Sequence, residues 1–461
     1  MGAGKSTLGP ELAARLGRSF VSIDALVEAR TGATVQDLFG ERGEPVFREL
    51  EEQAAVEALA QSVSTVVELG GGALASERTR PVLAARAFTL LLETSPEEAW
   101  ERVSNSDRPL ARDPESFGAL YAERRDLYES VADGRARDLD GAVLVAAGVH
   151  VGRGSLDGLG RLVPGSGPVE LVAAEAVDGL HGARARDALG DRVMASHVVP
   201  SGEAAKTLAE AERLWSTLRL DRDGTIVVLG GGSTTDLTGF VAATYLRGVA
   251  WAPIPTTLVG QVDAAIGGKT AVDLDGKNRI GAFHWPARVV VDPDLLSTLP
   301  PAELENGRAE VVKTGLLAGE PLWELPRDEQ VRRCAAFKAA ICLRDPLDRG
   351  ARAWLNLGHT FAHALEAASG YTLPHGRAVA LGLLAAVRLS GLDDLARDME
   401  IVLGARPVRV DRDAAWVALQ QDKKRAEGRV RIVVLDAPGS PRIDDEVSDD
   451  ALRRALDTLI E

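Results

Sequence analysis

Short apolar runs alternate with longer amphipathic stretches over the first 300 residues of the chain. Three of these runs, residues 20–24, 63–69 and 225–229, each end on a carboxylate or lead into a glycine cluster. Short apolar runs followed by segments with a helical period predict buried parallel strands between helices. Beyond residue 300 the apolar positions recur at the helical spacing. The pattern therefore predicts α/β sheets first and an all-helical region last.

Glycine spacing divides this pattern into parts. Six glycines fall between residues 152 and 167, which is typical of a linker, and residues 142–147 are predicted to form one short strand beside it. The predicted parts are an α/β domain over residues 1–150, a linker over 151–168, a second α/β domain over 169–300 and an all-helical domain over 301–461.

Composition narrows the class of protein. The 461 residues are 45% hydrophobic and carry a formal net charge of -15, which argues against nucleic acid and anionic membranes as partners. No apolar run is long enough to span a bilayer. Cys334 and Cys342 lie in one predicted helix and are interpreted as reduced thiols of a cytoplasmic protein. Because the chain is acidic, clustered lysines and arginines indicate local pockets for anionic substrates.

Three of the seven histidines fall between residues 359 and 375. His359 and His363 are four residues apart, which places them on one face of a helix, and His375 follows a Gly-Tyr break where the chain can fold back. Upstream, Glu310 and Lys313 lie in an apolar helical pattern. Two imidazoles and one carboxylate that leave a position open are typical of a catalytic zinc site. The alternative, which suits an isolated His-x3-His, is a pair of ordinary helix-end histidines.

A phosphate-binding loop is indicated at the start of the sequence, over Gly2-Ala3-Gly4-Lys5-Ser6-Thr7. Glycines let backbone N–H groups surround phosphates, the lysine reaches the β and γ oxygens, and the hydroxyl binds Mg²⁺. Only the second half of the usual loop is present. Met1 is therefore interpreted as an internal residue of a longer natural chain.

The residues after this loop carry a specific resemblance. They include Asp24 after an apolar run, Arg48 in a helix, Gly70-Gly71-Gly72, Arg108-Pro109-Leu110, and Arg124 at a predicted helix start. Over residues 1–150 this set resembles shikimate kinase, which implies a P-loop kinase-like parallel sheet. The resemblance implies that shikimate is bound by Asp24, Arg48, Gly71 and Arg124. It also implies that ATP and Mg²⁺ are bound by Gly2, Gly4, Lys5, Ser6 and Thr7, with Ser6 on the metal, and that Arg108 is a lid arginine. Ser22 stands where this family usually has a second aspartate.

Glycines and lysines also mark the second α/β part. Glycines 230–232 separate a predicted strand from a helix, where a backbone can approach a pyrophosphate. Lys269 and Lys277 each follow glycines, and Asn278 comes next. Such positions suit a phosphorylated, polyhydroxylated substrate.

These segments, with Ala309–Lys313, Leu355–His363, His375-Gly376 and Asp422-Lys423-Lys424, resemble 3-dehydroquinate synthase over roughly residues 165–461. The resemblance implies a Rossmann-like domain, then a helical domain, with Zn²⁺ or Co²⁺ held by Glu310, His359 and His375. It implies that NAD is bound by Glu203, Lys206, Gly232, Asp236, Thr256, Thr257 and Thr298. It implies that the substrate meets Asp263, Lys269, Lys277, Asn278, Lys313, Lys338, Arg352, Asn356 and His363.

Together the resemblances imply a bifunctional enzyme with small-molecule substrates. One half would cyclise 3-deoxy-arabino-heptulosonate 7-phosphate with loss of phosphate, and the other would phosphorylate shikimate with ATP; a homodimer through the synthase half is a candidate assembly. The alternatives are another sugar-phosphate cyclase, which the fused kinase-like half opposes, and a metal- and NAD-dependent polyol dehydrogenase, which needs no phosphate pocket. Because its phosphate loop is incomplete, the first half is either an active kinase or a degenerate scaffold.

Overall fold

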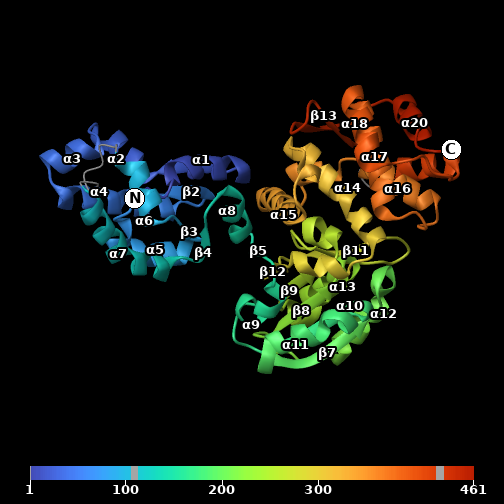
Figure 1. Cartoon of the computed structure of the whole chain (residues 1–461), viewed down its shortest axis with the longest axis horizontal. Helices are drawn as coiled ribbons and strands as arrows, with labels where there is room; N and C mark the ends of the chain where they lie inside the picture. Colours follow the sequence, from blue (N-terminus) through green and yellow to red (C-terminus); the bar gives the residue numbers. More distant parts are fainter. Residues whose placement is uncertain (1, 105–112, 422–429) are drawn as a thin grey trace. The chain divides into compact units, whose positions relative to one another are not determined.

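The computed structural model describes residues 2–104, 113–421 and 430–461. The chain forms two compact units, Met1–Ala147 and Gly148–Glu461 (Figure 1). Each unit contains parallel strands between helices, and the second also contains a large helical region. This is the α/β fold class predicted from the sequence.

The first unit has two parallel strand pairs, β1 (Ser19–Ser22) with β2 (Thr65–Glu68) and β3 (Leu90–Leu92) with β4 (Gly134–Ala136). Within the described residues each of these sheets has two strands. The helices of this unit are α1 (Lys5–Leu16), α2 (Ile23–Thr31), α3 (Val35–Glu41), α4 (Glu44–Ala60), α5 (Thr79–Arg86), α6 (Pro96–Val103), α7 (Pro114–Val131) and α8 (Leu139–Ala146).

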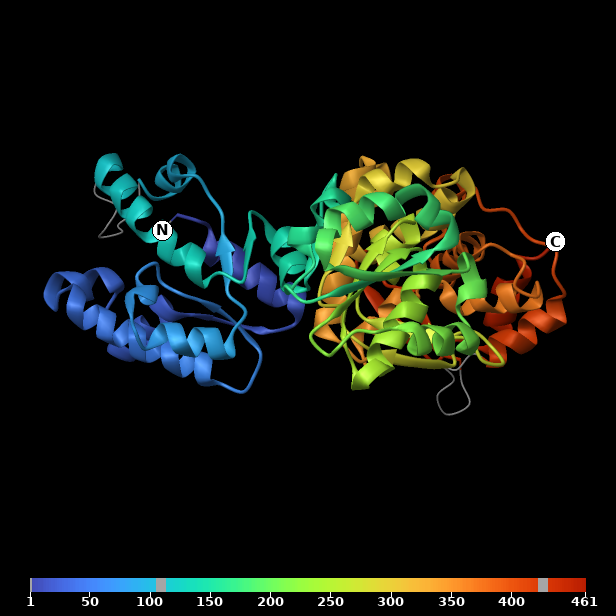
Figure 2. The same cartoon turned by 90° about the horizontal axis from the view of Figure 1, so that it is seen from below.

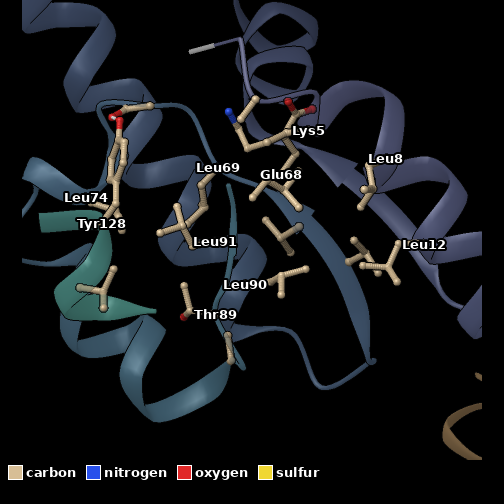
Figure 3. Close-up of a pocket in the computed structure, with 18 of the residues that line it drawn as sticks. Lys5, Leu8, Leu12, Glu68, Leu69, Leu74, Thr89, Leu90, Leu91 and Tyr128 are labelled. Carbon is tan, nitrogen blue, oxygen red and sulfur yellow. Dashed lines mark hydrogen bonds between the residues drawn. The ribbon is translucent and has the colours of Figure 1, made fainter. Parts of the chain in front are cut away.

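A cavity of about 1070 Å³ lies between β2 and β3. Its walls are apolar side chains of α1 and of both strands, including Leu8, Leu12, Leu90 and Leu91 (Figure 3). All four residues of β2 are only half-buried. The strand predicted over residues 63–69 therefore forms, but it is not buried, because its free edge faces this cavity.

Three details of the first unit differ from the sequence predictions. Residues 142–147 are not a strand but belong mainly to α8, which begins where the Asp138 side chain accepts a hydrogen bond from the Gly141 N–H (2.8 Å). Arg124 lies inside α7 and not at its start, because that helix is capped by Asp113 and begins at Pro114. Asp24 lies in the first turn of α2.

The second unit contains a four-stranded parallel sheet in the order β7-β6-β8-β9. Its strands are β6 (Val169–Ala174), β7 (Val193–Val199), β8 (Thr225–Gly230) and β9 (Ala250–Pro255). Every residue of β6 and β8 is buried, since apolar clusters cover both faces of the sheet. The α-helices around it are α9 (Leu159–Leu162), α10 (Glu175–Val177), α11 (Ala183–Leu189), α12 (Leu208–Thr217) and α13 (Gly232–Thr244).

The prediction of a linker over residues 151–168 is wrong, because these residues belong to the second compact unit. Strand β5 (Val149–Val151) pairs in parallel with β12 (Val289–Val291). Leu156, Leu159 and Val163 are at most 2% exposed and pack in the core beneath the sheet. The boundary between the compact units lies at Ala147/Gly148.

The remaining elements form the helical region and two hairpins. In Figure 1 the helical region, orange to red, lies to one side of the green sheet, and Figure 2 shows the same unit from below, with the sheet in front of part of that region. The hairpins are β10 (Lys269–Val272) with β11 (Ile280–Phe283), and β13 (Ile432–Leu435) with β14 (Pro441–Asp444). The described residues after 300 are therefore mainly helical, with one hairpin among them. The helices are α14 (Pro301–Ala318), α15 (Arg327–Arg344), α16 (His359–Ala368), α17 (His375–Leu389), α18 (Asp393–Leu403), α19 (Arg412–Gln421) and α20 (Asp449–Asp457).

Candidate active sites

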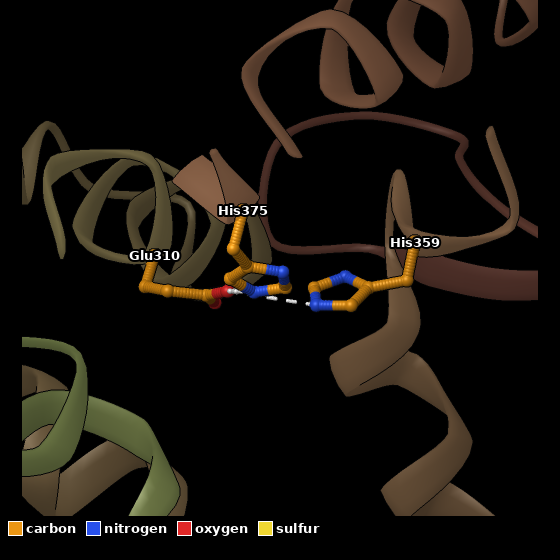
Figure 4. Close-up of side chains that lie close together, drawn as sticks. All are labelled: Glu310, His359 and His375. Carbon is orange, nitrogen blue, oxygen red and sulfur yellow. Dashed lines mark hydrogen bonds and ion pairs between the residues drawn. The ribbon is translucent and has the colours of Figure 1, made fainter. Parts of the chain in front are cut away.

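Glu310, His359 and His375 converge from three helices of the second unit (Figure 4). One donor atom of each lies within 4.8 Å of the others. The Glu310 Oε1 atom is 3.2 Å from His375 Nε2 and 3.5 Å from His359 Nε2. Four ligands placed tetrahedrally about zinc at about 2.0–2.1 Å are about 3.3 Å apart. The three side chains therefore fit a zinc-sized ion.

The local sequence explains why these three side chains meet. His359 and His375 are the first residues of their helices, and Glu310 lies in the middle of buried α14. Gly358 caps α16 with a positive φ of 77°, and a Cβ atom there would come within 2.7 Å of the Leu383 backbone nitrogen. Only glycine fits this close approach of α16 to α17.

The electrostatic surroundings of the triad favour metal binding at Glu310 and His359. Burial and the Lys313 ammonium both lower the pKa of His359, which keeps the imidazole neutral. Burial alone would raise the pKa of Glu310, but Lys313 and the two imidazoles lower it well below its usual range. For His375, hydrogen bonds to Glu310 and Glu366 outweigh burial and raise the pKa to about 10.

Glu366 is a buried acid that the sequence analysis missed. Its carboxylate lies 3.3 Å from Nδ1 of His375, whose Nε2 faces Glu310. A carboxylate on the second ring nitrogen fixes the tautomer and orientation of a ligating histidine. The available signal was spacing, since Glu366 lies seven residues after His359 and so faces the same side of α16.

We expect Glu366→Gln to lower metal affinity about 10- to 100-fold, because the amide no longer favours the ligating tautomer of His375. Titration with Co²⁺, followed by its visible absorption, measures this affinity. Phosphate release at saturating metal is expected to stay within a few-fold of the unsubstituted chain. Glu329→Gln, at a partly exposed acid of α15, is the control. Equal metal affinity in both variants would remove the orienting role.

A charge cluster lies beside the triad. Lys313 donates to Asp263 (Nζ to Oδ2, 2.6 Å) and forms an ion pair with Glu310, and Lys338 also binds Asp263. Asp263 lies in a π-helical turn, η7 (Gly260–Ala264), that packs against α15. Burial lowers the pKa of Lys313, but the two carboxylates outweigh it, raising the pKa and keeping the lysine charged.

A polar network begins at the glycine-rich helix start. Lys206 binds Asp236 (2.9 Å) and Asn278, and Ser233 donates to Glu203 (2.7 Å). This network joins five of the residues predicted to bind NAD or substrate, because Lys277 lies 3.9 Å from Glu203. Burial outweighs the attraction of Lys206 and raises the pKa of Asp236 to about 6.

Lys277 connects this network to the triad. Its Nζ atom is 3.8 Å from Glu366, and it lies over the Tyr371 ring at 5.0 Å. On the other side, a Cβ atom at Gly232 would lie 3.2 Å from Ala264, the neighbour of Asp263. The glycine-rich helix start, the charge cluster and the triad therefore form one continuous site.

Four further residues were predicted to bind NAD or substrate, and not all of them lie at this site. The Thr257 hydroxyl accepts a hydrogen bond from the Gly260 N–H (3.1 Å), in the turn that holds Asp263, and Thr256 directly follows β9. Lys269 pairs with Asp348 at 2.5 Å. Thr298 instead hydrogen-bonds His181 (2.9 Å), outside the network of Lys206.

Arg352 and Asn356 lie in the short helical segment before α16, and His363 lies within α16. Arg352 is 1% exposed and donates to the backbone carbonyls of Gly267 (2.8 Å) and Pro346 (3.0 Å), so it braces the glycine pair before Lys269. Asn356 donates to the Ala353 carbonyl (3.0 Å). His363 is exposed one turn after His359, with ring centroids 5.7 Å apart, and is not a member of the metal-type group.

The use of lysine supports this site. The chain has eight lysines among 53 basic residues. Five of them are the lysines just described: Lys206, Lys269, Lys277, Lys313 and Lys338. A sixth, Lys5, lies in the phosphate-type loop of the first unit. The remaining two, Lys423 and Lys424, lie outside the described residues, so every described lysine lies at one of the two candidate sites.

In the first unit, the predicted phosphate loop leads into α1. Gly4 caps this helix with a φ of 85°, and α1 begins at Lys5. A small cavity of about 270 Å³ is lined by Gly2–Thr7 and by Arg102 and Val103. The helix start faces this cavity with its backbone N–H groups, which suits an anion.

The residues predicted to bind shikimate gather around Glu51, a buried acid that the sequence analysis missed. Arg48 donates to Glu51 (2.7 Å), and Asp24 and Arg124 both act on the pKa of Glu51, which burial raises. Tyr128 donates to the Gly71 carbonyl (2.5 Å), and Arg124 lines the large cavity with Gly71. The structure thus brings all four predicted residues together.

Some residues singled out in the sequence lie outside the described residues, namely Arg108 and the segment Asp422–Lys424.

Cys334 and Cys342 are both buried in α15 as free thiols, in agreement with the sequence prediction. Burial raises the pKa of Cys334 to about 12, so it is not a reactive thiolate. Among the described residues, no helix combines the length and apolarity that a membrane crossing requires.

The fold and the donor sets define the class of protein. The second unit combines a glycine-rich, anion-binding helix start with a metal-type triad and a lysine-rich pocket, and the first unit is P-loop kinase-like. The family model for the 3-dehydroquinate synthase N-terminal domain matches residues 196–306, and that for its C-terminal domain matches residues 307–424. The shikimate kinase family model matches residues 1–142.

Curated relatives agree with this class. A 3-dehydroquinate synthase of Symbiobacterium thermophilum is 39% identical over 68% of this chain and 97% of its own length. One of Gloeobacter violaceus is 44% identical over 58% of this chain and 81% of its own. The solved structure of the 2-epi-5-epi-valiolone synthase ValA from Streptomyces hygroscopicus is similar at 25% identity and a TM-score of 0.59, covering 68% of this chain and 96% of that one.

The chain belongs to the 3-dehydroquinate synthase family and carries a shikimate kinase domain ahead of the synthase. It is thus a bifunctional enzyme of the shikimate pathway, a lyase joined to a phosphotransferase. These findings confirm the function predicted from the sequence.

Proposed function

We propose that the synthase site works with a divalent metal on Glu310, His359 and His375 and with NAD beside the glycine-rich start of α13. The spacing of the triad supports the metal, as argued above. The related ValA structure is described with NAD⁺ and Zn²⁺ bound. For NAD, the free N–H groups of α13 would hold the pyrophosphate, with Glu203, Lys206, Asp236, Thr256 and Thr257 as polar partners and Thr298 at the periphery. Zn²⁺ or Co²⁺ suits this donor set.

When bound, NAD supplies a reversible hydride acceptor and the metal supplies a Lewis acid for a substrate oxygen. The chain's own residues bind and orient the heptulosonate phosphate. Lys269, Lys338 and Arg352 would hold the phosphate as the leaving group, and Asp263, Lys277, Asn278 and Asn356 would hold hydroxyls or the carboxylate. Lys313 keeps Asp263 and Glu310 ionised, since its ammonium binds both carboxylates.

His363 is the group we assign to proton exchange with a substrate hydroxyl. It is exposed beside His359 and is not part of the triad. If it were a fourth protein ligand, the open position that a catalytic metal needs would be closed.

For the first unit we propose ATP-dependent phosphorylation of shikimate. Lys5, Ser6 and Thr7, with the backbone of Gly2 and Gly4, would hold the phosphates and Mg²⁺, and Arg108 would cover them. Asp24, Arg48, Gly71 and Arg124 would hold shikimate around Glu51. The observation that supports this is the convergence of those four residues on one buried acid.

The proposal is tested by measuring phosphate release from the heptulosonate phosphate, with and without a chelator. We expect release to stop when the chelator removes the metal and to return on adding Zn²⁺ or Co²⁺. NADH absorbance should show no net accumulation, because the hydride returns within each cycle. Stoichiometric NADH would indicate a simple dehydrogenase instead. Shikimate-dependent ADP formation in the same sample tests the first unit, and its absence would favour a scaffold.

A further inference from the structure

Glu68, the last residue of β2, contacts the phosphate loop directly. The Ser6 hydroxyl donates a hydrogen bond of 2.7 Å to Glu68 Oε1. We propose that Glu68 is the carboxylate that holds Mg²⁺ together with Ser6 in the kinase unit. This inference rests on the kinase function proposed above and adds to it a metal ligand that the sequence did not suggest.

The geometry of the pair suits magnesium. Mg²⁺ takes oxygen ligands at about 2.0–2.1 Å in an octahedron, so neighbouring ligand oxygens are about 2.9 Å apart. The Ser6 and Glu68 oxygens already lie near this separation, before any ion is added. Phosphate-loop enzymes use the loop hydroxyl and one carboxylate from a neighbouring strand for this metal. Glu68 has that placement, since β2 lies in contact with α1.

The surroundings of Glu68 also favour a metal. The side chain is half-buried at the loop end of the large cavity, where Figure 3 shows its carboxylate beside Lys5. In the paired strand β1, the residue in register is Ser22, which has a hydroxyl and no carboxylate. Asp24 is the next acid along that segment, and it lies beside Gly70 and Glu51, in the cluster assigned to shikimate.

A simpler role for Glu68 is to stabilise the start of α1, since an acid near a helix N-terminus is favourable without any metal. The two roles differ in their dependence on Mg²⁺. A capping acid affects folding alone. A metal-holding acid changes how much Mg²⁺ strengthens nucleotide binding.

The test compares ATP affinity of the 461-residue chain in Mg²⁺ and in EDTA, by calorimetry, for the unsubstituted protein and for Glu68→Gln. Changes even to outer-shell carboxylates lower metal affinity about 10- to 100-fold. We therefore expect Glu68→Gln to reduce the gain from Mg²⁺ at least about tenfold and to leave the affinity in EDTA within about twofold. Glu57→Gln, at an exposed acid of α4, should keep the full gain.

Two outcomes overturn the proposal: a full Mg²⁺ gain in Glu68→Gln, or no Mg²⁺ gain in the unsubstituted chain. Should the variant fail to fold, Fe²⁺ with ATP, ascorbate and peroxide is used on the unsubstituted chain, where cleavage at both residues 6 and 68 is expected. Cleavage at the loop without residue 68 also overturns it. Because the experiment measures ATP binding and not turnover, it can confirm or refute Glu68 as a magnesium ligand even if the chain does not phosphorylate shikimate.

Discussion

Replacing His359 with alanine is expected to abolish metal binding and synthase activity together. Its Nε2 lies 3.5 Å from Glu310 in a three-donor set, and two donors do not hold a catalytic zinc. A metal ion contributes several kcal/mol of transition-state stabilisation, which corresponds to a rate loss on the order of a thousandfold. Metal content after dialysis and phosphate release measure the two effects.

His150→Gln is the matched control for this substitution. His150 is a half-buried histidine of the same unit that hydrogen-bonds Ser155 (3.0 Å) and lies outside the metal-type group. The His150→Gln protein should keep the metal content and the phosphate release of the unsubstituted chain. A His359→Ala protein that holds metal and releases phosphate like the control would remove His359 from the ligand set.

The second large effect is expected on stability, from Lys313→Met. Lys313 is 1% exposed and binds two carboxylates, Asp263 and Glu310. Removing one partner of a buried ion pair costs about 3–5 kcal/mol, because the remaining charge stays buried without compensation. The free energy of unfolding of the metal-free protein, from urea titration of the second unit, should fall by this amount. Synthase activity should be lost as well.

A second substitution separates charge from packing. Adding Glu310→Gln to Lys313→Met removes the buried carboxylate that loses its lysine partner, while Asp263 keeps its ion pair with Lys338. Part of the lost stability should therefore return. Arg184→Met, which breaks an exposed pair with Asp157, should cost at most about 1 kcal/mol. If Lys313→Met costs no more than this control, the cluster does not stabilise the fold.

Local sequence patterns were sufficient to predict an element when all the residues that define it are close together in the chain. The strand and glycine-rich turn before α13 were predicted correctly because a buried strand and the glycines beside it are adjacent in the chain. Residue types and spacing suggested a metal site, and the resemblance to 3-dehydroquinate synthase implied Glu310, His359 and His375 as its ligands; the structure brings these three side chains together. Glu366 and Glu51 were missed, since an acid within a helix pattern looks like any solvated charge until its neighbours are known.

The linker prediction failed for a similar reason, because the contacts that order this segment join residues far apart in the sequence. Six glycines between residues 152 and 167 suggest a flexible connection, but β5 pairs with β12, which lies about 140 residues later in the chain. Leu156 and Leu159 are buried by the sheet, and that contact is not local. The apolar run at 142–147 fits a strand or a helix equally well. The Asp138 cap favours the helix.

The sequence by itself determined the α/β class, the two halves of different chemistry, and the residue types of both sites, because these depend on composition, period and short spacing. Only the tertiary structure decided which charges meet. It placed Lys277 between Glu203 and Glu366, and Glu68 against Ser6, through contacts between segments 62 to 89 residues apart. Such pairings follow from how strands and helices pack, and no local pattern encodes them.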